Sequence, residues 1–251
     1  MIKTLPRRLK GARGITGAIK NMVETLVRLK RIYNKLVHTK HSHELRYWKE
    51  RFALEGGKLQ NDFYAKLMLS ISDEENDDFL RGKIVGDFGC GPRGSLVWAR
   101  QASLKIGIDV LATKYLECFP LELISHGVIY VSSSELHIPL PDSICDYVYS
   151  VNSLDHVKNL LPMCNELRRV LKPGGEIIGS FNLNHLPSTA EPQRISENIL
   201  RKMLFRNYEI IHWWVSAPGP VDDLYRPLYE RKLIDPAGGE AYLWARARKP
   251  L

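Results

Sequence analysis

The spacing of apolar residues changes several times along the chain, and each change predicts an element. From about residue 15 to residue 37, apolar residues recur mainly every three or four positions with lysine and arginine between them, which predicts an amphipathic basic helix. A second helical region is predicted within residues 41–80. Beyond residue 83, short apolar runs alternate with stretches of helical spacing. The runs predict strands near 84–85 and at 104–110, 128–131, 145–151, 176–181, 208–215 and 240–248.

Helical spacing between these strands completes the pattern. It predicts helices at 112–125, 158–171 and 192–204, the first of them interrupted near Pro120. Such an alternation is typical of a mostly parallel sheet with helices on both faces. The stretch 216–239, rich in proline and aromatic residues, predicts a long insert before the last strand.

Residues 83–94 read K-I-V-G-D-F-G-C-G-P-R-G and give the most specific local signal. Apolar Ile84 and Val85 lead into a turn with three glycines, and helical spacing resumes from Ser95. This predicts a strand, a tight turn and a helix. Glycines suit a place where the backbone turns at positive φ, or where a ligand lies against it with no Cβ between them. The glycine spacing alone is shared with dinucleotide-binding proteins.

Asp87 precedes the first of these glycines by two residues, and its charge narrows the choice of ligand. A pyrophosphate at a helix N-terminus is doubly anionic, so an adjacent carboxylate would raise its energy, which disfavours NAD. S-adenosylmethionine carries an ammonium and a sulfonium but no phosphate. A carboxylate stabilises these groups by charge and hydrogen bonding, so Asp87 favours the cationic ligand.

The string D-F-G-C-G-P-R-G over residues 87–94 resembles the first motif of the class I S-adenosylmethionine-dependent methyltransferases. R-V-L-K-P-G-G at 169–175 and the strand at 145–151 are similar to later segments of that family. The resemblance implies an α/β fold: a seven-stranded, mostly parallel Rossmann-like sheet with helices on both faces and an N-terminal helical extension. It further implies a basic helical extension or cap at 1–80, and a methyltransferase domain at 81–251 with a substrate-side insert at about 216–239.

The cofactor implied by the resemblance is S-adenosyl-L-methionine, with S-adenosyl-L-homocysteine as product. Asp109 ends the second strand, twenty residues past Gly89, where an acid can accept hydrogen bonds from both ribose hydroxyls. Taken alone, an acid there is also a common loop cap. The loop after the third strand corresponds to the family's adenine loop. The cofactor-binding residues that we expect are Asp87, Gly89, Cys90, Gly91, Arg93, Asp109, Val110, Ser134, Glu135 and Asn152.

The loop after the fourth strand should face the reacting methyl group, because ligands of open α/β sheets lie beyond the carboxyl ends of the strands. Asp155 and His156 are the titratable pair of this loop, and His185 follows the fifth strand on the same side. We expect a histidine to accept the proton of the acceptor, with Asp155 orienting it. The alternative is that Asp155 caps a helix and His156 only packs. No cluster in the sequence suggests a metal, and none is expected.

Charge is concentrated at the start of the chain. Residues 1–51 hold fourteen Lys and Arg against three acids, a surplus of +11, so the net charge of +8 leaves the rest slightly acidic. The helix at 15–37 is therefore a candidate for contact with an anionic membrane surface, and nucleic acid is a less favoured partner. Packing as a cap helix is the third alternative. No apolar run spans a bilayer, and the four scattered cysteines suit reduced core positions, so a cytoplasmic protein is predicted.

Together these observations predict an enzyme that methylates a small molecule or a glycan- or lipid-linked acceptor at oxygen. Two alternatives stay open at this point. One is an RNA methyltransferase, which the basic composition favours, and the other is a non-catalytic protein that binds the cofactor. Tyr47, Trp48 and Tyr64 of the second helical region are candidates for a lid over the cofactor.

Overall fold

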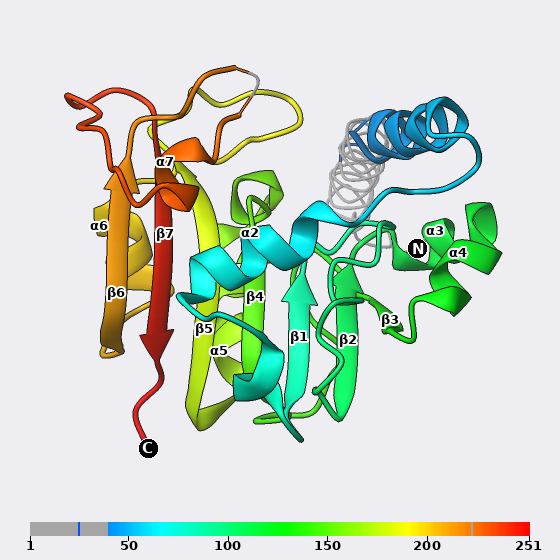
Figure 1. Ribbon diagram of the computed structural model, residues 1–251, viewed down its shortest axis with the longest axis horizontal. Helices are drawn as coiled ribbons and strands as arrows, with labels where there is room; N and C mark the ends of the chain where they lie inside the picture. Colours follow the sequence, from blue (N-terminus) through cyan, green and yellow to red (C-terminus); the bar gives the residue numbers. More distant parts are fainter. Residues whose placement is uncertain (1–24, 26–39, 222) are drawn as a thin grey trace, which may run out of the picture. The chain divides into compact units, whose positions relative to one another are not determined.

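The predicted strands are present and form one sheet in the computed structural model (Figure 1). The sheet has seven strands in the order β3-β2-β1-β4-β5-β7-β6, and only β7 runs antiparallel to its neighbours. This confirms the mostly parallel, Rossmann-like sheet. The strands are β1 (Ile84–Phe88), β2 (Leu104–Asp109), β3 (Ile129–Ser132), β4 (Cys145–Val151), β5 (Leu171–Leu183), β6 (Glu209–Ser216) and β7 (Ala241–Arg248).

The structure describes Thr25, residues 40–221 and residues 223–251. The chain divides into two units, Met1–Glu44 and Leu45–Leu251, and the second contains the whole sheet. The predicted basic helix at 15–37 lies outside the described residues, apart from Thr25. Within the described part of the chain, no helix combines the length and the apolar character needed to cross a membrane.

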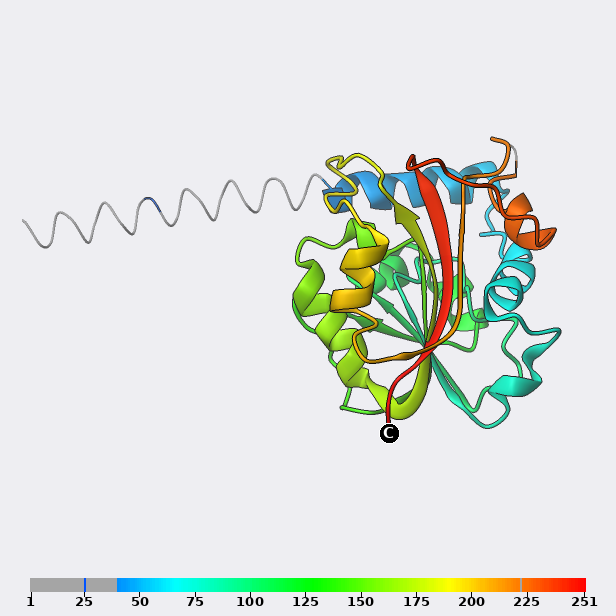
Figure 2. The ribbon, with the colours of Figure 1, turned by 90° about the vertical axis from the view of Figure 1, so that its left-hand side faces the viewer.

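Helices cover both faces of the sheet (Figure 2). In the second unit, residues 45–54 are helical, and further helical segments follow along the chain. These are α2 (Phe63–Ser72), η1 (Asp77–Leu80), α3 (Ala112–Cys118), α4 (Pro120–Ser125), η2 (Leu154–His156), α5 (Leu160–Val170), α6 (Glu197–Met203) and α7 (Arg226–Tyr229). The break between α3 and α4 at Pro120 is as predicted, because a proline cannot donate the backbone hydrogen bond of a continuing helix.

The two larger hydrophobic cores among the described residues lie on opposite faces of the sheet. On one face, α5 and α6 pack their buried residues against β4 and β5, with Leu167 and Ile177 fully buried. On the other face, α2 packs Met68 and Ile71 against Tyr149 and Trp244. Burial on both sides fits the apolar side chains on both faces of β4 and β5, such as the adjacent Val148 and Tyr149. The sheet is thereby a rigid base for the loops at its carboxyl edge.

The helix predicted from Ser95 does not form. Residues 91–98 are a series of turns instead, closed by short-range bonds such as that from Val97 N–H to the Gly94 carbonyl at 3.0 Å. Gly91 and Gly94 both have positive φ, and Pro92 lies between them, so the backbone is not continuously right-handed there. The apolar spacing that suggested a helix instead buries Leu96 and Ala99 beneath the turns.

Candidate active site

Two carboxylates lie at the carboxyl ends of neighbouring parallel strands, as predicted. Asp87 belongs to β1 and Asp109 ends β2, and both are almost completely buried. Asp87 accepts a short hydrogen bond from the Ser95 hydroxyl. Asp109 accepts the N–H of Gly91 at 3.0 Å on one oxygen and the N–H of Leu111 at 2.8 Å on the other. Each carboxylate oxygen can accept a second bond, so Asp109 can still receive a ligand hydroxyl.

The turn between these carboxylates requires glycine at two positions. Gly89 has φ +73°, and a Cβ there would lie 2.2 Å from the Cβ of Ser153. Gly91 has φ +56°, and a Cβ there would lie 3.1 Å from the Trp48 ring. Ser153 closes the turn from below by donating to the Phe88 carbonyl at 2.8 Å. The turn is therefore held tightly against the end of β4, with no room for a side chain at Gly89.

Burial changes the acidity of Asp87. Loss of water around the carboxyl, together with the smaller effect of the neighbouring charge of Asp109, raises its pKa from the ordinary 3.8 to about 7. The hydrogen bond from Ser95 acts in the opposite direction. A cation bound beside Asp87 would supply the missing stabilisation of its ionised form.

A segment from the start of the second unit covers the glycine turn. Trp48 stands over Gly91, and its indole N–H is buried without a hydrogen-bond partner. The Arg93 guanidinium lies 5.5 Å from the Trp48 ring centroid. It donates hydrogen bonds to the Glu55 carboxylate and to the Gln60 carbonyl. Arg93 thus anchors the covering segment to the turn, and cofactor binding by this residue stays a prediction.

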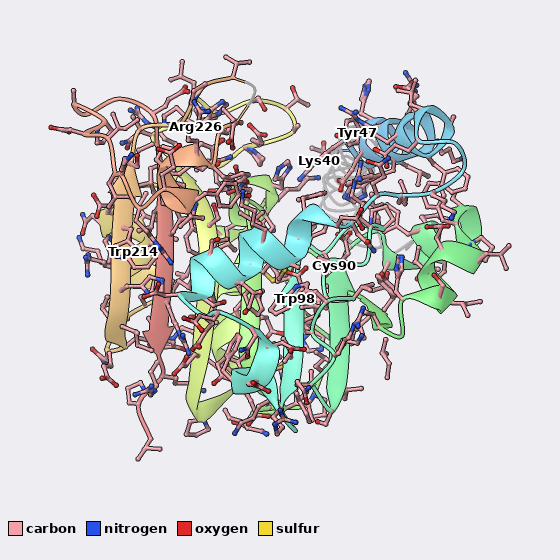
Figure 3. The ribbon with its side chains drawn as sticks, in the orientation of Figure 1. Lys40, Tyr47, Cys90, Trp98, Trp214 and Arg226 are labelled. Carbon is pink, nitrogen blue, oxygen red and sulfur yellow. The ribbon has the colours of Figure 1, made fainter. Side chains whose placement is uncertain are left out.

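The lid candidates differ in position. Trp48 lies over the turn. Tyr64 of α2 is half-buried near Asp87, and loss of water around the Tyr64 hydroxyl raises its pKa, with a further contribution from the Asp87 charge. Tyr47 is exposed at the surface (Figure 3). Of the three lid candidates, Trp48 and Tyr64 therefore lie at the turn.

Other predicted cofactor residues surround the carboxylates. Cys90 is buried in the turn, where its sulfur would lie 2.9 Å from a Cβ at Gly107 (Figure 3). Val110 is half-buried directly after Asp109. In the loop after β3, the Ser134 hydroxyl accepts the N–H of His137 at 2.9 Å, and Glu135 accepts the N–H of Lys158 at 3.1 Å. Both side chains shape their own loop, and their contact with an adenine stays a prediction.

Asn152 follows β4, and two other parts of the chain fix its side chain. Its φ of +46° is unusual for a residue other than glycine, and asparagine tolerates this region best. Its side-chain amide donates to the Tyr225 hydroxyl, and its carbonyl oxygen accepts from Ser180 at 2.9 Å. Tyr225 lies in the predicted insert, so the insert contacts the carboxyl edge of the sheet at this point.

A polar cluster lies beyond β4 and β5, where the proton acceptor was predicted. The buried Asp155 accepts a hydrogen bond from the Asn182 amide at 2.9 Å. His156 Nε2 lies 4.0 Å from Asp155 Oδ1 and 3.7 Å from Glu191 Oε1. His185 Nδ1 lies 3.4 Å from Glu191 Oε2. The fold thus brings the three predicted catalytic residues together around Glu191.

Two members of this region had no role in the sequence prediction. Asn182 orients Asp155, and Tyr225 holds Asn152. Asn182 directly follows the predicted strand 176–181, so a polar residue at a strand's carboxyl end was an available signal. Tyr225 carried no such signal, because its position depends on how the insert folds back.

Residues 86–179, which contain the turn and the end of β4, match a family model described as a methyltransferase domain. This match supports the resemblance to the class I S-adenosylmethionine-dependent methyltransferases. The cofactor that it implies is S-adenosylmethionine, and the residues present fit it. A buried, weakly acidic Asp87 suits the cationic end of the cofactor, and Asp109 has acceptor capacity for a diol. The unpartnered N–H of Trp48 adds a donor above the glycine turn.

Two curated relatives align with parts of the chain. A sterol 24-C-methyltransferase of Aspergillus fumigatus is 32% identical over 103 residues, which are 38% of this chain and 26% of that protein. The chloroplastic tocopherol O-methyltransferase of Arabidopsis thaliana is 29% identical over 116 residues, which are 43% of this chain and 32% of that protein. The match therefore spans about a quarter to a third of each relative.

Solved structures share the fold. An S-adenosylmethionine-dependent methyltransferase from Mesorhizobium loti superposes with a TM-score of 0.51 at 20% sequence identity, covering 68% of this chain and 92% of that one. At this identity the likeness supports the fold alone.

Proposed function

We propose that the protein transfers a methyl group from S-adenosylmethionine to a hydroxyl oxygen of a small molecule or of a glycan- or lipid-linked acceptor. The observation that carries this proposal is the position of the polar cluster around Glu191. It lies at the same edge of the sheet as Asp87 and Asp109, beyond the neighbouring strands β4 and β5. The proposed binding side for the methyl donor, at Asp87 and Asp109, is therefore adjacent to the proposed side for the methyl acceptor, at the polar cluster.

The donor side binds and orients the cofactor, which supplies an electrophilic methyl group when bound. Asp87 pairs with its ammonium, and Asp109 accepts its ribose hydroxyls beside the glycine turn. Trp48 covers the turn and keeps water from it. Because the donor is already reactive, positioning and exclusion of water can supply much of the rate.

The acceptor side receives the proton that the acceptor hydroxyl loses as its oxygen bonds to the methyl carbon. His156 and His185 are the proposed bases, and both lie beside Glu191. Both imidazoles are partly exposed, so an acceptor can reach them. Asp155, held by Asn182, orients His156 by its charge.

The class of acceptor is supported by two of the relatives and by aromatic residues of the insert and of β7. Both aligned relatives are named for lipid substrates, a sterol and a tocopherol. Tyr225 and Tyr242 have ring centroids 5.6 Å apart, and Tyr225 bonds Asn152 at the edge of the cluster. Aromatic faces suit a hydrophobic or sugar ring. The segment 15–37 is proposed to hold the protein at an anionic membrane surface, where such acceptors reside.

A transfer assay with methyl-labelled S-adenosylmethionine tests the proposal. The full chain is incubated with a host lipid extract, a soluble small-molecule extract and total RNA, and label is followed by scintillation and mass spectrometry. We expect a gain of one methyl on an oxygen in one of the first two fractions, with loss of transfer in Asp109→Ala. The variant Glu117→Gln, whose exposed carboxylate pairs with Lys114 on α3, should act as wild type.

Three results would contradict the proposal. Label in RNA would identify a nucleic-acid methyltransferase. Cofactor binding without label in any fraction would identify a non-catalytic binding protein. Label on carbon or nitrogen of a small molecule would refute the oxygen acceptor while leaving methyl transfer in place.

A further inference from the structure

Three ligand-type atoms converge at the acceptor edge from two separate segments. Asp155 Oδ1, His156 Nε2 and Glu191 Oε1 belong to the loops after β4 and β5, and they lie within 4.8 Å of one another. The separations from His156 Nε2 are 4.0 Å to Asp155 and 3.7 Å to Glu191. A point equidistant from three atoms so spaced lies roughly 2.1–2.5 Å from each, a range that overlaps the bond lengths of divalent metals.

The three atoms do not bond one another. Both separations exceed hydrogen-bond range. The side chain of Asp155 is only 3% exposed, yet its Oδ1 has no hydrogen-bond partner, and this oxygen is the one nearest His156. A buried carboxylate oxygen without a partner is costly, and a bound cation would compensate it. The three atoms are therefore arranged as ligands around a common point and not as directly bonded ion pairs.

Outer contacts hold these side chains in place. The Asn182 amide donates to the other oxygen of Asp155 at 2.9 Å, so Oδ1 is left pointing at the cluster. Gln193 ties the loop of Glu191 to the loop of His156 through its side-chain amide, which donates to the Val157 carbonyl at 3.0 Å. Such partners are typical of metal sites, where they orient the ligands.

We propose that Asp155, His156 and Glu191 bind one divalent metal ion. Two carboxylates and one imidazole suit Mn²⁺ or Zn²⁺ better than Ca²⁺ or Cu⁺. His156 is 41% exposed and Glu191 28% exposed, so the open coordination positions face the side from which an acceptor arrives. The sequence suggested no metal, because Glu191 is separated from the other two residues by more than thirty positions.

The metal would have a defined part in the transfer, and this part rests on the proposed function. The acceptor hydroxyl binds an open position and becomes more acidic. Its proton passes to His185, which lies 3.4 Å from Glu191. The oxygen forms a bond to the methyl carbon as the carbon–sulfur bond breaks, and the products are the methyl ether and S-adenosylhomocysteine. His156 then serves as a ligand, and the metal keeps its oxidation state.

Direct metal binding tests the site without methyl transfer. The full chain is stripped with EDTA and titrated with Mn²⁺ and with Zn²⁺, following heat by calorimetry and free Mn²⁺ by its paramagnetic resonance signal. We expect one ion per chain. Glu191→Gln, a change in a loop that does not threaten folding, and Asp155→Asn should each lower affinity by about tenfold or more. Glu117→Gln is the matched control on α3 and should bind as wild type.

Absence of saturable binding at millimolar metal would overturn the site, as would equal binding by wild type and both cluster variants. The catalytic part has a separate readout: turnover that falls after EDTA and returns with Mn²⁺ supports it, and turnover unchanged by metal removal refutes it. Normal metal binding with no turnover under any condition would count against the proposed function and leave the metal site intact.

Discussion

Burial of the Asp87 carboxyl leads to a prediction about stability and cofactor affinity that Asp87→Asn can test, because asparagine removes the charge and keeps the shape. Burial raises the pKa of Asp87 to about 7 in the cofactor-free protein, against an ordinary value of 3.8. The unfolded chain therefore ionises this group far more readily than the folded protein does. Asp87→Asn should therefore change the free energy of unfolding by an amount that depends on pH.

The sign follows from proton binding. Between about pH 4 and pH 7 the folded state binds more protons than the unfolded state, so wild-type stability should fall as pH rises through this window. Above pH 7 the folded protein carries the full free-energy cost of burying an ionised Asp87. The difference between the two pKa values corresponds to about 4 kcal/mol. Asp87→Asn should thus be more stable than wild type near pH 8, by up to about 4 kcal/mol, with the difference vanishing near pH 4.

Cofactor affinity should change in the opposite direction. A cation beside Asp87 stabilises its ionised form, so the variant should bind S-adenosylmethionine more weakly by about 1–3 kcal/mol. Wild type should also release a proton on binding at about pH 6, because the bound cation lowers the pKa of Asp87. Asp87→Asn should release none.

Urea unfolding followed by tryptophan fluorescence at several pH values measures the first effect. Calorimetry in two buffers of different ionisation enthalpy measures the proton release. Asp78→Asn is the control, since its carboxylate is 61% exposed in a surface pair with Arg81 and should change stability by less than about 1 kcal/mol. A variant less stable than wild type at pH 8, or wild-type stability that does not fall between pH 4 and 7, would refute the reasoning.

Three further predictions concern the site and the sheet. Asp109→Ala should weaken S-adenosylmethionine binding by about 1–3 kcal/mol in calorimetry, and unchanged affinity would remove Asp109 from the cofactor site. His156→Ala should lower turnover in the transfer assay while cofactor affinity is kept, and wild-type turnover would dismiss His156 from the reaction. Glu176→Gln should destabilise the fold by about 3 kcal/mol in urea, because the buried carboxylate pairs with Arg246 at 2.7 Å; the exposed Glu209→Gln is its control, and equal effects would contradict the role of burial.

The polar cluster around Glu191 could be predicted in part. Asp155, His156 and His185 follow predicted strands, and carboxyl ends of parallel strands meet at one edge, so their proximity was accessible from the sequence. Their spacing around Glu191 was not, because it depends on how the loop after β5 folds back toward β4. Arg93 is a similar case: the motif suggested a ligand contact, and a partner far along the chain, Glu55, occupies its guanidinium.

What the sequence determined by itself is local: the strands, the helix break at Pro120 and the glycine turn after Asp87. These follow from apolar periodicity and from backbone preferences, which act over a few residues. Only the tertiary structure decided that residues 91–98 form turns instead of a helix, and that Asp155, His156 and Glu191 surround a common point. Those outcomes depend on burial and on contacts between distant segments, whose energies no short stretch of sequence contains.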